Sequence, residues 1–275
     1  MFDIAKFKIF AKKQLEKRWA VPIAITTITI ILSFIFSLPN SFPLNQEFIN
    51  IIANGDMNSI STYLENSLSS ASTLLTFILG IIQLLVSFVI TAASTGVYLK
   101  MSRSPEPISF KDFVDGFANW SRGILIGLWL LLWLYIWAFL AAVIISIVVV
   151  VPTFFLVDSV PVLSSILNII VFGIIIFIFT NRRLSYSMIY YIAIEFPKVS
   201  VPKAMNISKL ITKGNLMNLF LLELSFISWI FLTVITFGIA SLWYEPYYNM
   251  TLTNAYHGLL KNAVEKGLIK QEDLI

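Results

Sequence analysis

Arg182 to Trp229 read RRLSYSMIYYIAIEFPKVSVPKAMNISKLITKGNLMNLFLLELSFISW. The stretch holds a pair of arginines, a Glu-Phe-Pro break, a basic amphipathic segment, a Lys-Gly-Asn turn and the start of an apolar helix. Such an order is expected where a chain leaves a membrane, lies along its surface and enters it again. The rest of the chain can be interpreted as earlier versions of this unit and their returns through the membrane.

The composition favours a membrane protein and disfavours an enzyme. Hydrophobic residues make up 58% of the chain and charged residues only 12%, about half of the charge expected in a soluble domain. Without cysteine there is no disulfide, thiol nucleophile or thiolate metal site, and the single histidine, His257, argues against a histidine cluster or a Ser-His-Asp triad. The sequence shows no phosphate-binding loop and no zinc-protease or serine-hydrolase motif. We therefore expect no catalytic residue, no cofactor and no metal.

The apolar pattern predicts an all-α polytopic membrane bundle that forms a single domain over 1–275. Six spans are predicted, at about 19–38, 73–99, 123–150, 162–181, 216–236 and 240–260. The fourth helix is expected to continue to residue 194, about 50 Å in all, which is longer than the roughly 30 Å apolar core of a bilayer. The sixth span is the most polar and is expected to break at Glu245-Pro246. If it does not cross, five spans remain.

Each pair of spans is predicted to follow an amphipathic helix that lies at the membrane surface. These helices are expected over 1–18, 109–123 and 200–214, capped by Asp3, Ser109 and Ser200. The capping serine and the glycine that ends the segment are 14 residues apart in both later segments, Ser109 to Gly123 and Ser200 to Gly214, so we interpret the chain as three copies of a surface helix and a hairpin. The alternative is that any loop helix before a span must be amphipathic and basic. In the second span, residues 91–96 (TAASTG) offer small side chains for close helix packing.

Basic residues predict the orientation. All 19 lysines and arginines lie in 1–18, 100–122, 182–213 and 261–270. An even number of spans places these segments on one side, which the positive-inside rule makes cytoplasmic, together with both termini and the tail 261–275. The net charge of +4 therefore indicates orientation and contact with anionic lipids, and no nucleic-acid partner is expected.

Four segments resemble a known family. They are RRLSYSMIYYIAIEFP (182–197), AMNISKLITKGN (204–215), LFLLELSFISW (219–229) and ITFGIASLWYEPYYNMTLTNAYHGLL (235–260). They are similar to bacterial integral membrane proteins catalogued as domain of unknown function 975. Where that family shows Gly-Trp, this chain has Ser228-Trp229. The resemblance implies a multi-span fold in a bacterial cell membrane and supplies no activity, substrate or cofactor.

The candidate functional residues are the embedded charges Arg182, Arg183, Glu223 and Glu245, because charges inside a membrane are costly. The arginines and Glu223 fall at matching depths, so an ion pair between them is predicted; the alternative is that the arginines extend to the interface. Glu245 and the proline after it could line a transport cavity, or could form a capped turn in an aromatic belt. His257 is expected at the inner interface, with a proton relay as the alternative.

Two functions fit these features. One is a non-catalytic membrane module that binds lipids or other membrane proteins, such as a scaffold, a sensor or an immunity factor. The other is a small transporter or transporter accessory subunit that uses Glu223 and Glu245. The basic surface helices favour the first, and the embedded acids favour the second.

Overall fold

The computed structural model describes residues 2–37, 50, 53–54, 59–60, 70–147 and 161–274. These residues are helical or lie in turns, and no strand occurs among them. The last three residues of the expected third span, 148–150, lie outside the described residues. The helices are, in chain order, α1 (Ile4–Leu15), α2 (Ala20–Ser37), α5 (Ser70–Arg103), α6 (Phe110–Gly116), η2 (Phe117–Asn119), α7 (Trp120–Ile145), α9 (Pro161–Tyr186), α10 (Ile189–Glu195), α11 (Val201–Thr212), α12 (Leu216–Leu224), α13 (Ile227–Ile235), α14 (Ser241–Glu265) and η4 (Gln271–Leu274).

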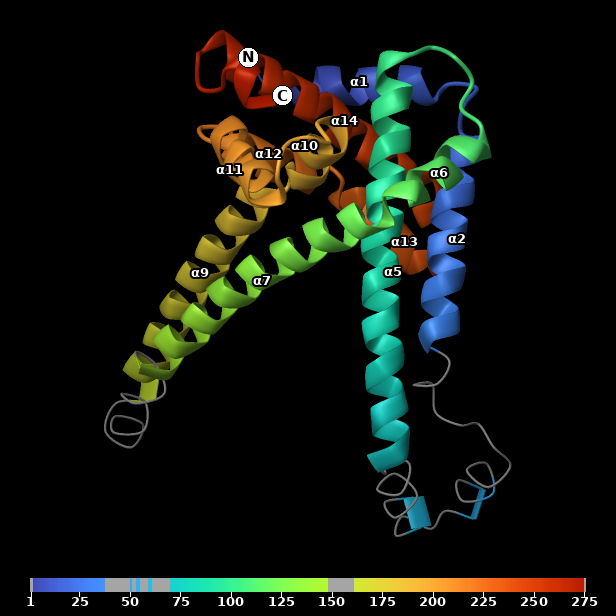
Figure 1. The fold of residues 1–275 in the computed structure, drawn as a ribbon. Helices are drawn as coiled ribbons and strands as arrows, with labels where there is room; N and C mark the ends of the chain where they lie inside the picture. The colour runs from blue at the N-terminus through green and yellow to red at the C-terminus, as the bar shows by residue number, and fades with distance from the viewer. Residues whose placement is uncertain are drawn as a thin grey trace.

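The helices form a head and two legs (Figure 1). The head contains α1, α6, α10, α11, α12 and the second half of α14, and both termini lie there. One leg, the α2/α5 leg, contains α2 and most of α5; the other, the α7/α9 leg, contains α7 and α9. The legs diverge as they leave the head. This arrangement leaves long apolar helices largely outside the packed part of the molecule.

Four segments are long and apolar enough to cross a membrane: Thr76–Arg103, Phe110–Ile145, Ile169–Glu195 and Leu216–Ile235. Helices α1 and α2, which are bent by 98° at their junction, would make a fifth if the pair counted as one span. The prediction of an all-helical chain with several membrane-crossing helices is confirmed at this level. Helix α14, at the place of the expected sixth span, is not among these described segments that are long and apolar enough to cross a membrane.

Helix α14 corrects one expectation. The break predicted at Glu245-Pro246 does not form, because α14 runs without interruption from Ser241 to Glu265 with Pro246 inside it. The proline lies in the second helical turn, so it removes only one hydrogen bond near the start of the helix. Helix α14 packs against α1, α2, α5, α11 and α13.

The fourth helix is interrupted where it was expected to be continuous. It ends at Tyr186, and α10 begins after a turn at Ser187 and Met188. The hydroxyl of Ser208 in α11 accepts a hydrogen bond from the Met188 amide (3.3 Å) and donates one to the Ser185 carbonyl (2.8 Å). A side chain inserted into the backbone ladder is an established cause of helix kinks. Helix α10 is consequently buried in the head, where neighbouring helices shield the end of the long fourth helix.

A similar interruption divides the expected fifth span into α12 and α13 at Ser225 and Phe226. Lys8 of α1 donates to the Ser225 carbonyl (2.9 Å), and its ammonium lies 4.1 Å from the centroid of the Phe226 ring. The lysine therefore supplies a partner for a carbonyl that the helix no longer uses.

The predicted caps form at α1 and α6. The Asp3 carboxylate accepts from the Lys6 amide (3.0 Å). At α6 the Ser109 amide donates to the Asp112 carboxylate (2.9 Å), as in a capping box. Ser200 occupies the predicted N-cap of α11, but its side chain makes no capping hydrogen bond.

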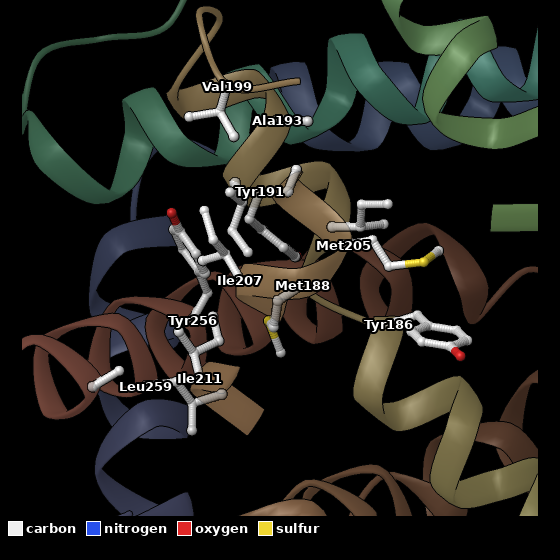
Figure 2. Packing of buried hydrophobic residues seen from close by; sticks show 14 of the residues in the cluster. Tyr186, Met188, Tyr191, Ala193, Val199, Met205, Ile207, Ile211, Tyr256 and Leu259 are labelled. Atoms are coloured by element: carbon white, nitrogen blue, oxygen red, sulfur yellow. The ribbon is translucent and has the colours of Figure 1, made fainter. Parts of the chain in front are cut away.

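The described residues form two hydrophobic core clusters, of which one joins α1 to α2, α5 and α14 and the other lies in the head (Figure 2). The cluster in the head surrounds α10, whose Ile189 and Ile192 have no exposed surface. Tyr191 stacks on Tyr256 of α14 with ring centroids 5.1 Å apart. By contrast, no residue is buried in the most apolar window of the segment Phe110–Ile145. The chain's internal packing therefore stabilises the head, while the legs present their side chains outward.

Candidate functional site

Helix α14 brings together three polar clusters, each of which includes an acidic residue. The first joins α14 to α9 and α12, the second to α2 and α5, and the third to α5 and α10. Polar groups inside a membrane bundle are costly unless they find partners. The polar residues of α14 weakened the sequence signal for a sixth span. In the structure the same residues contact the neighbouring helices.

The first cluster contains Arg183, Glu223 and Tyr248. The Arg183 guanidinium donates to Oε2 of Glu223 in an ion pair. The Tyr248 hydroxyl donates to the other carboxylate oxygen, Oε1, at 3.3 Å. Because both oxygens of Glu223 have partners, this acid holds α9, α12 and α14 together and has little capacity left for a ligand.

Arg182 does not join that cluster. Its guanidinium lies 4.0 Å from the centroid of the Trp137 ring, a cation–π contact. The Trp137 indole donates to the Tyr186 hydroxyl at 2.9 Å, and Lys209 lies 5.3 Å from the centroid of the Trp133 ring. The tryptophans of α7 therefore pack against basic side chains of the head; such contacts contribute about 0.5–2 kcal/mol each.

The second cluster surrounds a cavity of about 300 Å³ between α2, α5 and α14. Glu245 lines it, and Asn249 follows one turn later on the same helix face. Helix α5 contributes Thr91, Ser94 and Tyr98. Glu245 has no ion-pair partner among the lysines, arginines and histidine, all of which lie in the described part of the chain. The structure therefore separates Glu245 from Arg182, Arg183 and Glu223, which the sequence had grouped with it.

The third cluster was not predicted. Ser102 Oγ lies 2.8 Å from Nε2 of His257, and the neighbouring Arg103 forms an ion pair with Glu195 of α10. Ser102 Oγ also donates to the Leu99 carbonyl at 2.7 Å. Which of the two groups donates depends on the tautomer of the imidazole. The pair ties α5 to α14.

Basic residues divide into two groups. One group is used inside the fold: Arg122, for example, donates to the carbonyls of Ala193 (2.8 Å), Phe196 (3.2 Å) and Val199 (2.6 Å). In the other group are seven exposed lysine side chains with no hydrogen bond, ion pair or ring contact among the described residues: Lys13, Lys17, Lys111, Lys198, Lys213, Lys266 and Lys270. The second group leaves charge available at the head.

One signal in the sequence could have located the cavity. Positions 91, 94, 95 and 98 of α5 carry hydroxyl groups at helical spacing, as do parts of α2. We interpreted the small residues of this stretch only as a packing surface. Within the described residues, no group of three or more His, Cys, Asp or Glu side chains could hold a metal ion.

Comparisons with known proteins identify the family. No curated protein matches the chain, and no solved structure does. A family model described as "Protein of unknown function (DUF975)" matches residues 1–263. Because that match covers almost the whole length, the chain belongs to the DUF975 family.

Proposed function

We propose that this chain is a non-catalytic membrane module that binds lipids or other membrane proteins through its exposed legs. The observation that carries the proposal is the exposure of α9. Four consecutive residues, Ile176 to Phe179, are all exposed, with Phe177 at 67%. Successive residues of a helix point about 100° apart, so four of them cover its whole circumference. Among the described residues, every face of α9 at this level therefore keeps exposed side-chain surface, although α7 packs beside it.

A helix that is apolar on every side needs apolar surroundings. Lipid supplies them, and so does a helix of another membrane protein. The α7/α9 leg offers a long surface for either, since Leu125, Tyr135 and Phe139 of α7 are also exposed. Such a leg suits a scaffold, a sensor of the membrane or an immunity factor.

The proposed topology has six spans in three hairpins, with α14 as a sixth span that the other helices shield. The 19 basic residues support this orientation, because they lie at the head or next to it, where both termini are found (Figure 1). The positive-inside rule would place the head and both termini in the cytoplasm of a bacterial cell. The seven unpartnered lysines would then face the anionic lipid surface, at roughly 1 kcal/mol for each residue near it.

The test uses a photoreactive amino acid in place of Phe177, in the full-length protein within its native membrane. Irradiation is expected to produce lipid adducts or one adduct of defined mass with another membrane protein. The matched control places the same group at Phe226, which has no exposed surface and should give no intermolecular adduct. If both positions give the same adducts, the leg is not a selective binding surface and the proposal fails.

Transport is a second candidate, and the cavity beside Glu245 favours it. A binding site between helices near the middle of a membrane is typical of small transporters. Proteoliposomes offer a direct test, with radiolabelled sodium and methylammonium as probes. Flux that depends on the protein and is lost in Glu245→Gln would support transport over the binding module; equal leakage with and without protein would exclude transport of these probes.

A further inference from the structure

The cavity between α2, α5 and α14 has walls that offer hydrogen-bond acceptors. Each of the three helices contributes polar groups at helical spacing: Thr26 and Thr29 from α2, Thr91, Ser94 and Thr95 from α5, and Ser241 with Glu245 from α14. These side chains converge on one space of about 300 Å³. What they offer to a ligand depends on where their protons point.

The hydroxyl protons are already committed. Thr29 donates to the Ile25 carbonyl (2.9 Å), Thr91 to Ser87 (2.8 Å) and Ser94 to Ile90 (2.7 Å). Thr26 and Thr95 likewise donate to carbonyls of their own helices, and Ser241 donates to the Gly238 carbonyl in the turn before α14. A hydroxyl that donates its only proton to the backbone presents only lone pairs on its other side. The six serine and threonine oxygens can therefore accept from a ligand in this cavity, beside the donor groups that Tyr98, Tyr191 and Asn249 bring to its lining.

The carboxyl group of Glu245 lies on the same wall and supplies a negative charge when it is ionised. The Asn249 side chain interacts with it, but no lysine, arginine or histidine of the described chain forms an ion pair with it. Glu223, by contrast, has both Arg183 and Tyr248 as partners. A carboxylate beside several acceptor oxygens and without an ion-pair partner attracts a cation from outside.

We propose that this cavity binds a monovalent cation, with Glu245 as the counter-charge and the threonine and serine oxygens as additional ligands. Its volume is about ten times the roughly 30 Å³ that a water molecule occupies in the liquid. This space suits an alkali ion with part of its water shell or a small primary ammonium. Tyr98 and Tyr191 complete the lining, and aromatic rings are frequent neighbours of ammonium groups. The inference goes beyond the proposed function, because cation binding requires neither a partner protein nor transport.

The test measures thermal stability of the purified full-length protein in detergent during titration with NaCl or methylammonium chloride. A cation that binds only the folded state raises the unfolding midpoint along a saturable curve. We expect Glu245→Gln to raise the apparent Kd at least tenfold. Because wild type and variant meet the same salts, the difference between them is independent of ionic strength. The two salts show whether the site prefers an alkali ion or an ammonium group, because the response to the preferred cation saturates at the lower concentration.

A matched pair of threonine variants keeps the test valid if Glu245→Gln does not fold. Thr29→Val removes one oxygen from the cavity, and we expect it to weaken binding about threefold to tenfold. Thr233→Val removes a hydroxyl that donates to Trp229 on α13, away from the cavity lining, and should leave binding unchanged. The proposal is overturned if the wild type shows no saturable response to either cation, or if Glu245→Gln or Thr29→Val binds as tightly as Thr233→Val.

Discussion

The crossing of α5 and α7 allows a quantitative test of the fold. At Gly123 a Cβ atom would lie 3.0 Å from the Ala92 methyl, 3.2 Å from the Phe88 carbonyl oxygen and 3.3 Å from the Val89 Cα. Ordinary van der Waals contacts lie between 3.4 and 4 Å. Gly123→Ala must therefore push the two helices apart by several tenths of an ångström. Overpacking of this kind costs about 1–3 kcal/mol.

Gly80 supplies the matched control. It also lies inside an α-helix, on α5, but a Cβ atom there meets nothing within 4 Å. Alanine is a better helix former than glycine by about 1 kcal/mol, and this gain applies to both positions. In the difference between Gly80→Ala and Gly123→Ala the propensity term cancels, which leaves the crowding term of about 1–3 kcal/mol.

The measurement is the unfolding midpoint of each purified variant in the same detergent, followed by tryptophan fluorescence. For a chain of this size 1 kcal/mol corresponds to about 2–4 °C, so Gly123→Ala should unfold roughly 2–12 °C below Gly80→Ala. Equal midpoints, or a higher midpoint for Gly123→Ala, would show that α5 and α7 do not approach as closely as the structure has them.

Three further predictions concern polar contacts in the head. Exchange of the charges in Arg183→Glu with Glu223→Arg should recover part of the stability lost by each single change, with a coupling of about 1–3 kcal/mol because the pair is partly exposed; a double-mutant cycle of unfolding midpoints measures it, and additive losses would argue against the pair. Arg122→Lys should lower the unfolding midpoint by several degrees, since an ammonium on a flexible stem lacks the planar fork that reaches three carbonyls; an unchanged midpoint would show that these three hydrogen bonds do not stabilise the fold. Ser208→Ala leaves the Met188 amide without its partner and the Ser185 carbonyl with only the Thr212 hydroxyl at 3.5 Å; it should cost about 1–3 kcal/mol, detectable also as faster hydrogen exchange at Met188, and unchanged exchange there would count against the inserted hydroxyl.

The sequence predicted the apolar spans because their signal is local. Long runs with few charges identify α2, α5, α7 and α9 whatever their neighbours are. Interruptions are different, because the kink after Tyr186 depends on Ser208, which lies more than 20 residues away and reaches the kink only after α11 has folded back. Lys8 acts in the same way at the interruption of α12 and α13. A pattern within one segment cannot reveal a partner that tertiary structure supplies.

The candidate site shows the same limit in its choice of residues. Arg182 and Arg183 are adjacent, so their side chains point about 100° apart on a helix, and only one of them can face Glu223. The apolar residues before them surround α9 on every side and give no periodicity from which to choose. The packing of the helices decides which arginine pairs with the acid. Arg182 lies against the ring of Trp137 of α7, and Arg183 forms the ion pair with Glu223 of α12.

Helix α14 explains why the weakest predicted span became the centre of the polar structure. Hydropathy measures how well a segment tolerates lipid, but α14 is surrounded mainly by other helices and has little need of that tolerance. Its polar residues have different partners: Tyr248 contacts α12, Glu245 lines the cavity and His257 contacts α5. A segment of this composition is unstable alone in a bilayer and becomes stable only when its partners are present. The low hydropathy of α14 and its central position therefore have the same cause, which is its polar residues. We expect mutations in α14 to change function more than mutations in the other helices.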